Sequence, residues 1–121
     1  MHSDSAVKAL AALAQQSRLA IFRLLVQAGL EGIHAGRIGE TLGLAPATLS
    51  FHLKELANAG LIASRQEGRH VIYQAQYERM NELLGFLMEH CCEGDPKGCG
   101  APSFECQPKE PARYGAPRDQ K

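Results

Sequence analysis

The first 92 residues show the apolar periodicity of α-helices, interrupted at glycines and prolines. This pattern predicts four helices, over residues 6–13, 17–28, 35–42 and 46–59. Gly29 and Gly60 stand where a left-handed residue ends a helix. Gly43 and Pro46 bracket a tight turn between the third and fourth helices, so this pair is predicted to be a helix-turn-helix.

A β-hairpin is predicted next, over residues 61–66 and 69–75. The second strand is rich in β-branched and aromatic side chains, and Gly68 supplies the positive φ of a tight turn. A fifth helix is predicted over residues 77–92. Its apolar residues Met80, Leu84, Leu87 and Cys91 lie within about 40° of one line on the helix surface. The order of elements predicts a mainly α fold with a small β-hairpin, the winged helix-turn-helix.

Beyond Gly94, glycine and proline recur and the apolar periodicity stops. We therefore expect one structured domain over residues 1–92, followed by a loop and flexible tail over residues 93–121. A hydrophobic content of 45% with 21% charged residues fits one globular domain.

Charge adds little, because 13 Lys and Arg balance 13 Asp and Glu. Nucleic-acid binders usually neutralise phosphates, so a DNA-binding role has to rest on pattern instead of net charge. No apolar run approaches the roughly 18 residues of a membrane span, and the amino terminus lacks the features of a secretory signal. We expect a cytoplasmic location and no membrane partner.

Three blocks of sequence resemble the ArsR/SmtB family of metalloregulatory repressors. They are Leu-Ala-Gln-Gln-Ser-Arg-Leu at residues 13–19, Ala-Thr-Leu-Ser-Phe-His-Leu-Lys-Glu-Leu at 47–56 and Gly-Arg-His-Val-Ile-Tyr at 68–73. The resemblance implies a dimeric winged-helix repressor of transcription. Two departures concern helix caps: Gln15 and Gln16 stand where the family often has Asp-Pro, and Ala45 has no side-chain oxygen. A missing cap costs about 1 kcal/mol.

The fourth helix is the predicted DNA-reading element, since its leucines face inward and its polar residues face outward. Thr48 and Ser50 suit base edges or phosphates, Lys54 suits a phosphate, and Phe51 suits a thymine methyl. His52 lies about 60° from the core line, which favours a partly buried hydrogen-bonding role. Arg65 and Arg69 flank the turn of the wing. The predicted DNA-binding residues are Thr48, Ser50, Phe51, His52, Lys54, Arg65 and Arg69; the plainer alternative for each is a solvated surface.

A homodimer is expected because the first and fifth helices carry more apolar residues than one small core can cover. These residues are Ala6, Val7, Leu10, Leu13, Leu83, Phe86 and Leu87. A two-fold dimer presents two recognition helices about one DNA turn apart, which predicts an inverted-repeat operator of double-stranded DNA.

All four cysteines lie between residues 91 and 106, and clustered thiols in a reducing compartment indicate metal binding or redox chemistry. Thiolates prefer soft ions, among them As(III), Sb(III) and Zn(II). Gly94, Pro96 and Gly98 allow the chain to bring a third sulfur to the first two. The resemblance to arsenic repressors with a Cys-Cys pair after the fifth helix implies Cys91, Cys92 and Cys99 as ligands of As(III) or Sb(III). Cys106 has no counterpart there and remains an alternative third ligand.

Other functions stay open at this stage. His90 with three cysteines would suit Zn(II) or Cd(II), two sulfurs would suffice for a methylated arsenical, and a Cys–Cys link would make a redox sensor. Cys91 could also simply be buried. We find no Gly-rich phosphate loop, nucleophile elbow or two-His metal motif and predict no enzyme; a thiol transferase and a protein-interaction module are the rival classes.

Overall fold

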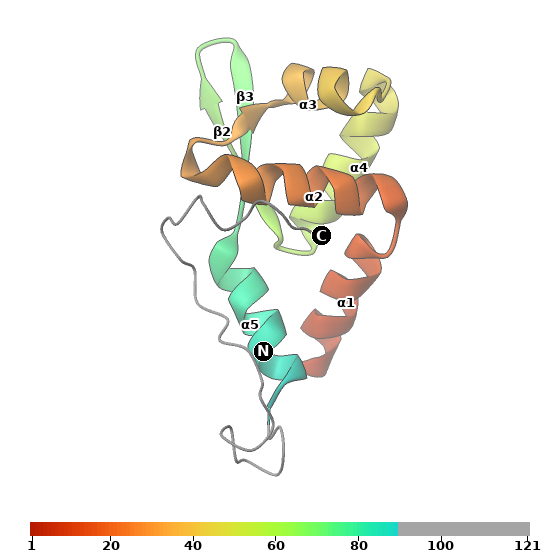
Figure 1. The fold of residues 1–121 in the computed structure, drawn as a ribbon, viewed down its shortest axis with the longest axis vertical. Helices are drawn as coiled ribbons and strands as arrows, with labels where there is room; N and C mark the ends of the chain where they lie inside the picture. Colours follow the sequence, from red (N-terminus) through yellow and green to blue (C-terminus); the bar gives the residue numbers. More distant parts are fainter. Residues whose placement is uncertain (90–121) are drawn as a thin grey trace, which may run out of the picture.

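The structure, a computed structural model, describes residues 1–89 (Figure 1). The elements in chain order are α1 (Ser3–Leu13), α2 (Gln16–Ala28), the 3₁₀ helix η1 (Gly29–Glu31), β1 (Ile33–His34), α3 (Ala35–Leu42), α4 (Pro46–Asn58), β2 (Ile62–Glu67), β3 (His70–Ala75) and α5 (Tyr77–Leu87). The predicted winged helix-turn-helix is confirmed.

Helix α2 crosses the middle of the molecule and separates two ends (Figure 1). Helix α3, the start of α4 and the tip of the β2–β3 hairpin lie on one side of it, α1 and α5 lie on the other, and α4 passes behind α2 to contact α1. Ile21 and Leu25 on α2 are fully buried, together with Leu56 on α4 and Leu83 on α5. Since α2 supplies core side chains to both ends, it is the central support of the fold.

The wing contains a strand that the sequence pattern does not predict. β1 pairs antiparallel with β3, placing Ile33 opposite Tyr73 and His34 opposite Ile72, and the sheet order is β1-β3-β2. A two-residue strand is too short to show an alternating pattern, which explains why it was missed. The hairpin itself is confirmed, with Glu67 opposite His70 and Gly68 at φ +63° in the turn.

Helix α5 ends at Leu87, so its predicted extension to residue 92 is wrong. Met88 is the C-cap, with its N–H bonded to the Leu84 carbonyl oxygen at 3.1 Å. The last turn has no basic residue, and the Glu89 carboxylate follows it at the negative end of the helix dipole. Cys91 and Cys92, which the prediction placed at the end of this helix, lie outside the described residues.

The two cap predictions have different outcomes. The side chain of Gln15 caps α2, because its Oε1 accepts a hydrogen bond from the Arg18 backbone N–H at 2.9 Å. The expected loss of a cap at this helix is therefore wrong; glutamine is long enough to reach the same N–H. At α4 the expectation is confirmed, since Ala45 makes no side-chain cap and the helix begins at Pro46.

Within residues 1–89, no single helix has the length and apolar character needed to cross a membrane. Taken together, α1 and the helical stretch from Gln16 to Glu31 reach that length and composition, but they meet at a bend of 100°. Both helices also contribute residues to the core.

Candidate nucleic-acid interface

Helix α4 has a buried leucine face and an exposed polar face, as its sequence predicts. Leu49, Leu53 and Leu56 are in the core. The exposed residues are Ala47, Thr48, Ser50, Phe51, Lys54, Ala57 and Asn58. Phe51 is 55% exposed, and an aromatic ring on an otherwise polar surface gains free energy when a partner covers it. The geometry therefore presents hydroxyls, one ammonium group and one apolar ring together, a set that suits the edges of bases.

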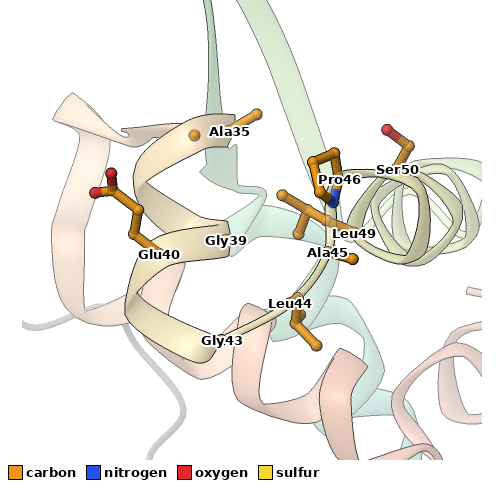
Figure 2. A pocket seen from close by; sticks show the side chains of 10 residues that line it. Ala35, Gly39, Glu40, Gly43, Leu44, Ala45, Pro46, Leu49 and Ser50 are labelled. Atoms are coloured by element: carbon orange, nitrogen blue, oxygen red, sulfur yellow. The ribbon is translucent and has the colours of Figure 1, made fainter.

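Helices α3 and α4 meet at a cleft of about 560 Å³ beside their connecting turn (Figure 2). Gly39 on α3 allows this close packing, since a Cβ there would lie 3.2 Å from the Leu44 carbonyl oxygen and 3.3 Å from Leu49 Cδ2. Small residues form much of the lining, and its charged side chain is the carboxylate of Glu40. This carboxylate repels phosphate, so the cleft is less suited to DNA than the outer face of α4.

His52 lies on the inner side of α4 and is 7% exposed. Its Nδ1 is 3.3 Å from Nη1 of Arg18 on α2, which confirms the buried hydrogen-bonding interpretation of this residue. Its inclusion among the DNA-contacting residues is corrected accordingly, because a buried ring bonded to α2 is not presented to a groove. The neighbouring Phe51 ring lies edge-on to it, with centroids 5.5 Å apart.

Arg65 on β2 is bonded within the chain. Its guanidinium donates to Glu67 Oε2 at 2.7 Å, to Gln74 Oε1 at 2.7 Å and to the Glu31 carbonyl oxygen at 2.9 Å. These bonds join both wing strands to η1 and place a carboxylate beside the positive charge. A DNA contact by Arg65 would have to exchange them, whereas Arg69 is exposed in the turn of the wing.

Two histidines that the sequence analysis did not single out meet where the wing joins α3. The His34 and His70 ring centroids are 4.8 Å apart, and His34 Nδ1 caps α3 by accepting from the Arg37 N–H at 3.2 Å. No signal in the sequence pairs them, because their proximity depends on the unpredicted strand β1. Across residues 1–89, no group of three or more His, Cys, Asp or Glu is arranged to hold a metal ion. The predicted ligands Cys91, Cys92, Cys99 and Cys106 lie outside the described residues.

The end of the molecule formed by α1 and α5 is apolar on its outside. Val7 is 64% exposed, Leu10 41% and Leu87 51%, while Leu13 and Phe86 are half-buried against the core. Ala6 and Leu83 were predicted to belong to this surface, but both are buried inside the chain. The reason is that α1 packs through its small side chains, so the alanine face is turned inward and the larger residues outward.

The apolar surface continues onto α2. A groove of about 650 Å³ is lined by Leu13, Leu19, Phe22, Arg23, Val26, Gln27 and Met80, from α1, α2 and α5. Leu19 and Val26 are exposed on α2. Val7, Leu10, Leu87, Leu19 and Val26 are referred to below as the apolar face, and their number exceeds the scattered exposed apolar residues that need no explanation.

Comparison with known proteins identifies relatives of this fold and sequence. Residues 13–65 match the model of a family described as a helix-turn-helix domain. The HTH-type transcriptional regulator YceK of Bacillus subtilis is 41% identical over 88 residues, which span 70% of this chain and 87% of YceK.

Two solved structures share the architecture. An ArsR-like transcriptional regulator from Rhodococcus sp. RHA1 aligns with a TM-score of 0.66 and 24% identity, covering 78% of this chain and 86% of that one. The homodimeric winged helix-turn-helix DNA-binding domain of a possible ArsR-family transcriptional regulator from Mycobacterium bovis aligns with a TM-score of 0.59 and 27% identity, covering 76% and 85%.

Proposed function

This chain belongs to the helix-turn-helix transcriptional regulators, and on that premise we propose that it is a dimeric repressor of the ArsR-like, winged type, released from its operator by arsenite or antimonite. YceK is named as a transcriptional regulator, and the related Mycobacterium bovis domain is named as a DNA-binding domain. We propose that this chain likewise regulates transcription by binding DNA, in the cytoplasm and without enzymatic activity. The observation that carries the DNA-binding part is the outer face of α4. There Thr48, Ser50, Phe51 and Lys54 are exposed on the side opposite the leucine core.

The proposed dimer uses the apolar face. Support comes from the exposed Val7, Leu10 and Leu87 and from the homodimeric state of the related domain from Mycobacterium bovis. Covering three such side chains on each subunit releases several kcal/mol, because a fully buried Val or Leu contributes about 1.5–3 kcal/mol. A two-fold pair of this kind reads an inverted repeat, with one recognition helix in each half-site.

The proposed inducer site consists of Cys91, Cys92 and Cys99, with Cys106 as an alternative third ligand. The donor set supports it: three thiolates suit As(III) or Sb(III), and residues 1–89 contain no cysteine and no cluster of metal ligands that competes with them. These residues follow α5, whose exposed Leu87 belongs to the apolar face. Gathering them around one ion would alter the packing of the two subunits and so the spacing of the recognition helices. A coupling of about 1–3 kcal/mol lowers operator affinity about 5- to 150-fold.

The test is a fluorescence anisotropy titration of the protein against a duplex from its own upstream region, with and without sodium arsenite. We expect tight binding without the ion and release with it. Cys91→Ser and Cys92→Ser should each bind the duplex normally and fail to respond to arsenite. Of Cys99→Ser and Cys106→Ser, we expect only Cys99→Ser to fail, and the opposite result would identify Cys106 as the third ligand. Absence of any binding would overturn the DNA-binding part.

The same assay separates the alternatives for the inducer. A Zn(II) or Cd(II) sensor would ignore arsenite and release with the divalent ion, and a redox sensor would respond to peroxide and recover with dithiothreitol. X-ray absorption of the arsenite-loaded protein should show a first shell of sulfur alone. A first shell containing nitrogen or oxygen would contradict the thiolate site, and so would a response that survives in a variant lacking all four cysteines.

A further inference from the structure

Arg18 is the side chain at which α1, α2 and α4 meet. Its backbone N–H bonds to Gln15 Oε1 at 2.9 Å, at the start of α2. Its Nε donates to the Ala12 carbonyl oxygen in the last turn of α1 at 2.6 Å, and Nη1 lies 3.3 Å from His52 Nδ1 on α4. One guanidinium thus connects the helix that carries Val7 and Leu10 to the proposed DNA-reading helix.

The bond to His52 specifies the state of the imidazole. A guanidinium has donors and no acceptor, so Nδ1 must be the acceptor and the ring proton lies on Nε2. His52 is 7% exposed, and a buried polar ring loses free energy unless it is hydrogen-bonded. Removing the Arg18 donor would therefore leave an unsatisfied group on the inner face of α4, where leucines surround it in the sequence at positions 49, 53 and 56.

Directional bonds, not an ion pair, hold Arg18. The ion pairs found within residues 1–89 are Arg65 with Glu67 and Arg79 with Glu82, and neither involves Arg18. Its acceptors, a backbone carbonyl and a neutral imidazole, require a particular orientation of the planar guanidinium. Beside it is a cleft of about 280 Å³ lined by Lys8, Ala11, Ala12, Arg18, Glu55, Asn58 and Ala59.

The packing of α1 explains why a hydrogen-bonded connection between α1 and α4 is needed. Helix α1 buries Ala6, Ala9 and Ala12 against its neighbours, and alanines do not interlock as larger side chains do. A flat, small-residue contact leaves the position of one helix along the other weakly determined. The two bonds of the Arg18 side chain supply what the alanines lack.

We propose that Arg18 is a positioning residue that, through His52, fixes the recognition helix α4 relative to the dimerisation helix α1. This inference rests on the proposed function for the roles of the two helices. In a dimer, the separation and angle of the two α4 helices depend on the geometry between α1 and α4 in each subunit. Arg18 therefore matters most when both half-sites are bound at once and little when one recognition helix binds alone.

The experiment compares four variants on two DNA probes. Arg18→Lys and His52→Leu break the connection. His52→Asn restores it, because the Asn Oδ1 replaces Nδ1 as acceptor. Arg79→Lys is the matched control, at a partly exposed arginine of α5 outside the groove and the apolar face. The probes are a full inverted repeat selected from a random duplex library by the wild-type protein, and a duplex carrying one half of it. Fluorescence anisotropy measures the affinity for each of the two probes, and sedimentation measures the dissociation constant of the dimer.

We expect Arg18→Lys and His52→Leu to bind the full site about tenfold or more weakly, since a hydrogen bond to a charged group contributes about 1.5–3 kcal/mol. Half-site affinity and dimerisation should change less than about threefold, and His52→Asn and Arg79→Lys should stay close to wild type. Equal losses on both probes would overturn the proposal, because they would indicate general destabilisation. A His52→Asn variant as weak as His52→Leu would overturn it too.

A measurement without DNA separates this proposal from the proposed function. In ¹⁵N spectra of wild-type protein, His52 should show the Nε2–H tautomer. Arg18→Lys should move the Nδ1 signal of His52 and also the amide signals of the last turn of α1. If wild type binds no duplex but these signals move together, the proposed function fails while the connection between α1 and α4 holds. If Arg18→Lys leaves the His52 signal in place, the connection itself is wrong.

Discussion

The two ends of the molecule on either side of α2 bury different kinds of side chain. At the DNA-binding end, Ile38, Leu53 and Leu56 are buried within the chain, together with Leu61 at the start of the wing. At the other end, α1 buries alanines and turns Val7 and Leu10 outward. Both ends are visible in Figure 1, with α3, the start of α4 and the tip of the wing above α2 and the pair of α1 and α5 below it.

This difference suits the two ends to different roles, contact with DNA and pairing with a second subunit. The DNA-binding end completes its core with its own residues, so its shape does not depend on a partner. The end formed by α1 and α5 leaves large apolar side chains uncovered, and covering them with a second copy is the simplest way to remove them from water. Reading of one half-site is therefore expected to be a property of one subunit, whereas the spacing of two half-sites is a property of the pair.

The strongest test of this comparison is Leu10→Glu on the apolar face. Each dimer would bury two of these carboxylates in place of two leucines. Because an unpaired buried carboxylate costs several kcal/mol, we expect dimerisation to weaken by at least about 3 kcal/mol. Sedimentation should show a monomer, and the circular dichroism spectrum should show unchanged helical content. Leu30→Glu is the control, since Leu30 is also exposed but belongs to η1. A dimer that survives Leu10→Glu would contradict the assignment of this face.

The next test, Leu56→Ala, is directed at the other end. Leu56 lies on the inner face of α4 and is fully buried. Removing its branched side chain should lower the free energy of unfolding by about 2–5 kcal/mol. Urea denaturation measures the loss. Leu87→Ala, on the exposed part of α5, should change the stability of the monomer by less than about 0.5 kcal/mol. Both variants are measured at protein concentrations below the dimer dissociation constant. Comparable losses of stability would remove the distinction between the DNA-binding end, which completes its own core, and the end formed by α1 and α5, which does not.

Most of the helices were predictable because they have a one-sided apolar pattern and begin or end beside a glycine or proline. The third helix was predicted at its observed bounds, and the leucine face of the fourth was assigned correctly. β1 and the end of α5 were not predicted, because β1 exists only through pairing with β3 and α5 ends at Leu87 without a glycine or proline to mark its end. Periodicity reports which face of an element is apolar, but it does not report where pairing or end effects stop the element.

The same limit applies to the candidate site. Exposure of Thr48, Ser50, Phe51 and Lys54 followed from a helical wheel alone. The contact between Arg18 and His52 joins residues 34 positions apart, and no local pattern encodes a contact of that range. Arg65 illustrates the opposite case: its place in the wing suggested a free cation, whereas the fold surrounds it with acceptors from β2, β3 and η1.

A smaller effect is expected at the DNA-binding end from Phe51→Ala. Since the ring is already 55% exposed, covering it with DNA would release only part of the free energy of full burial, about 1–1.5 kcal/mol. Operator affinity should fall about five- to tenfold, with loss of preference at one base pair, while thermal stability stays within about 0.5 kcal/mol. Unchanged affinity across all substituted operators would show that the ring does not contact a base.

The smallest expected effects concern the N-terminal caps of the helices, which differ between α2, α3 and α4. Gln15 and His34 each accept the N–H three residues along, at the starts of α2 and α3, but Ala45 at the start of α4 does not. Ala45 has the extended φ and ψ of an N-cap, −67° and 151°, so Ala45→Ser should place a hydroxyl within reach of the Thr48 N–H.

Ala45→Ser should therefore raise stability by about 1 kcal/mol, or about 4–8 °C in melting temperature for a domain of this size. Gln15→Ala should lower it by a similar amount, because it removes the existing cap of α2. Calorimetry of both variants without DNA measures the pair of effects, and opposite signs are the expected outcome. If Ala45→Ser fails to stabilise, the backbone N–H groups at the start of α4 are already satisfied by water, and the missing cap costs the DNA-binding end nothing.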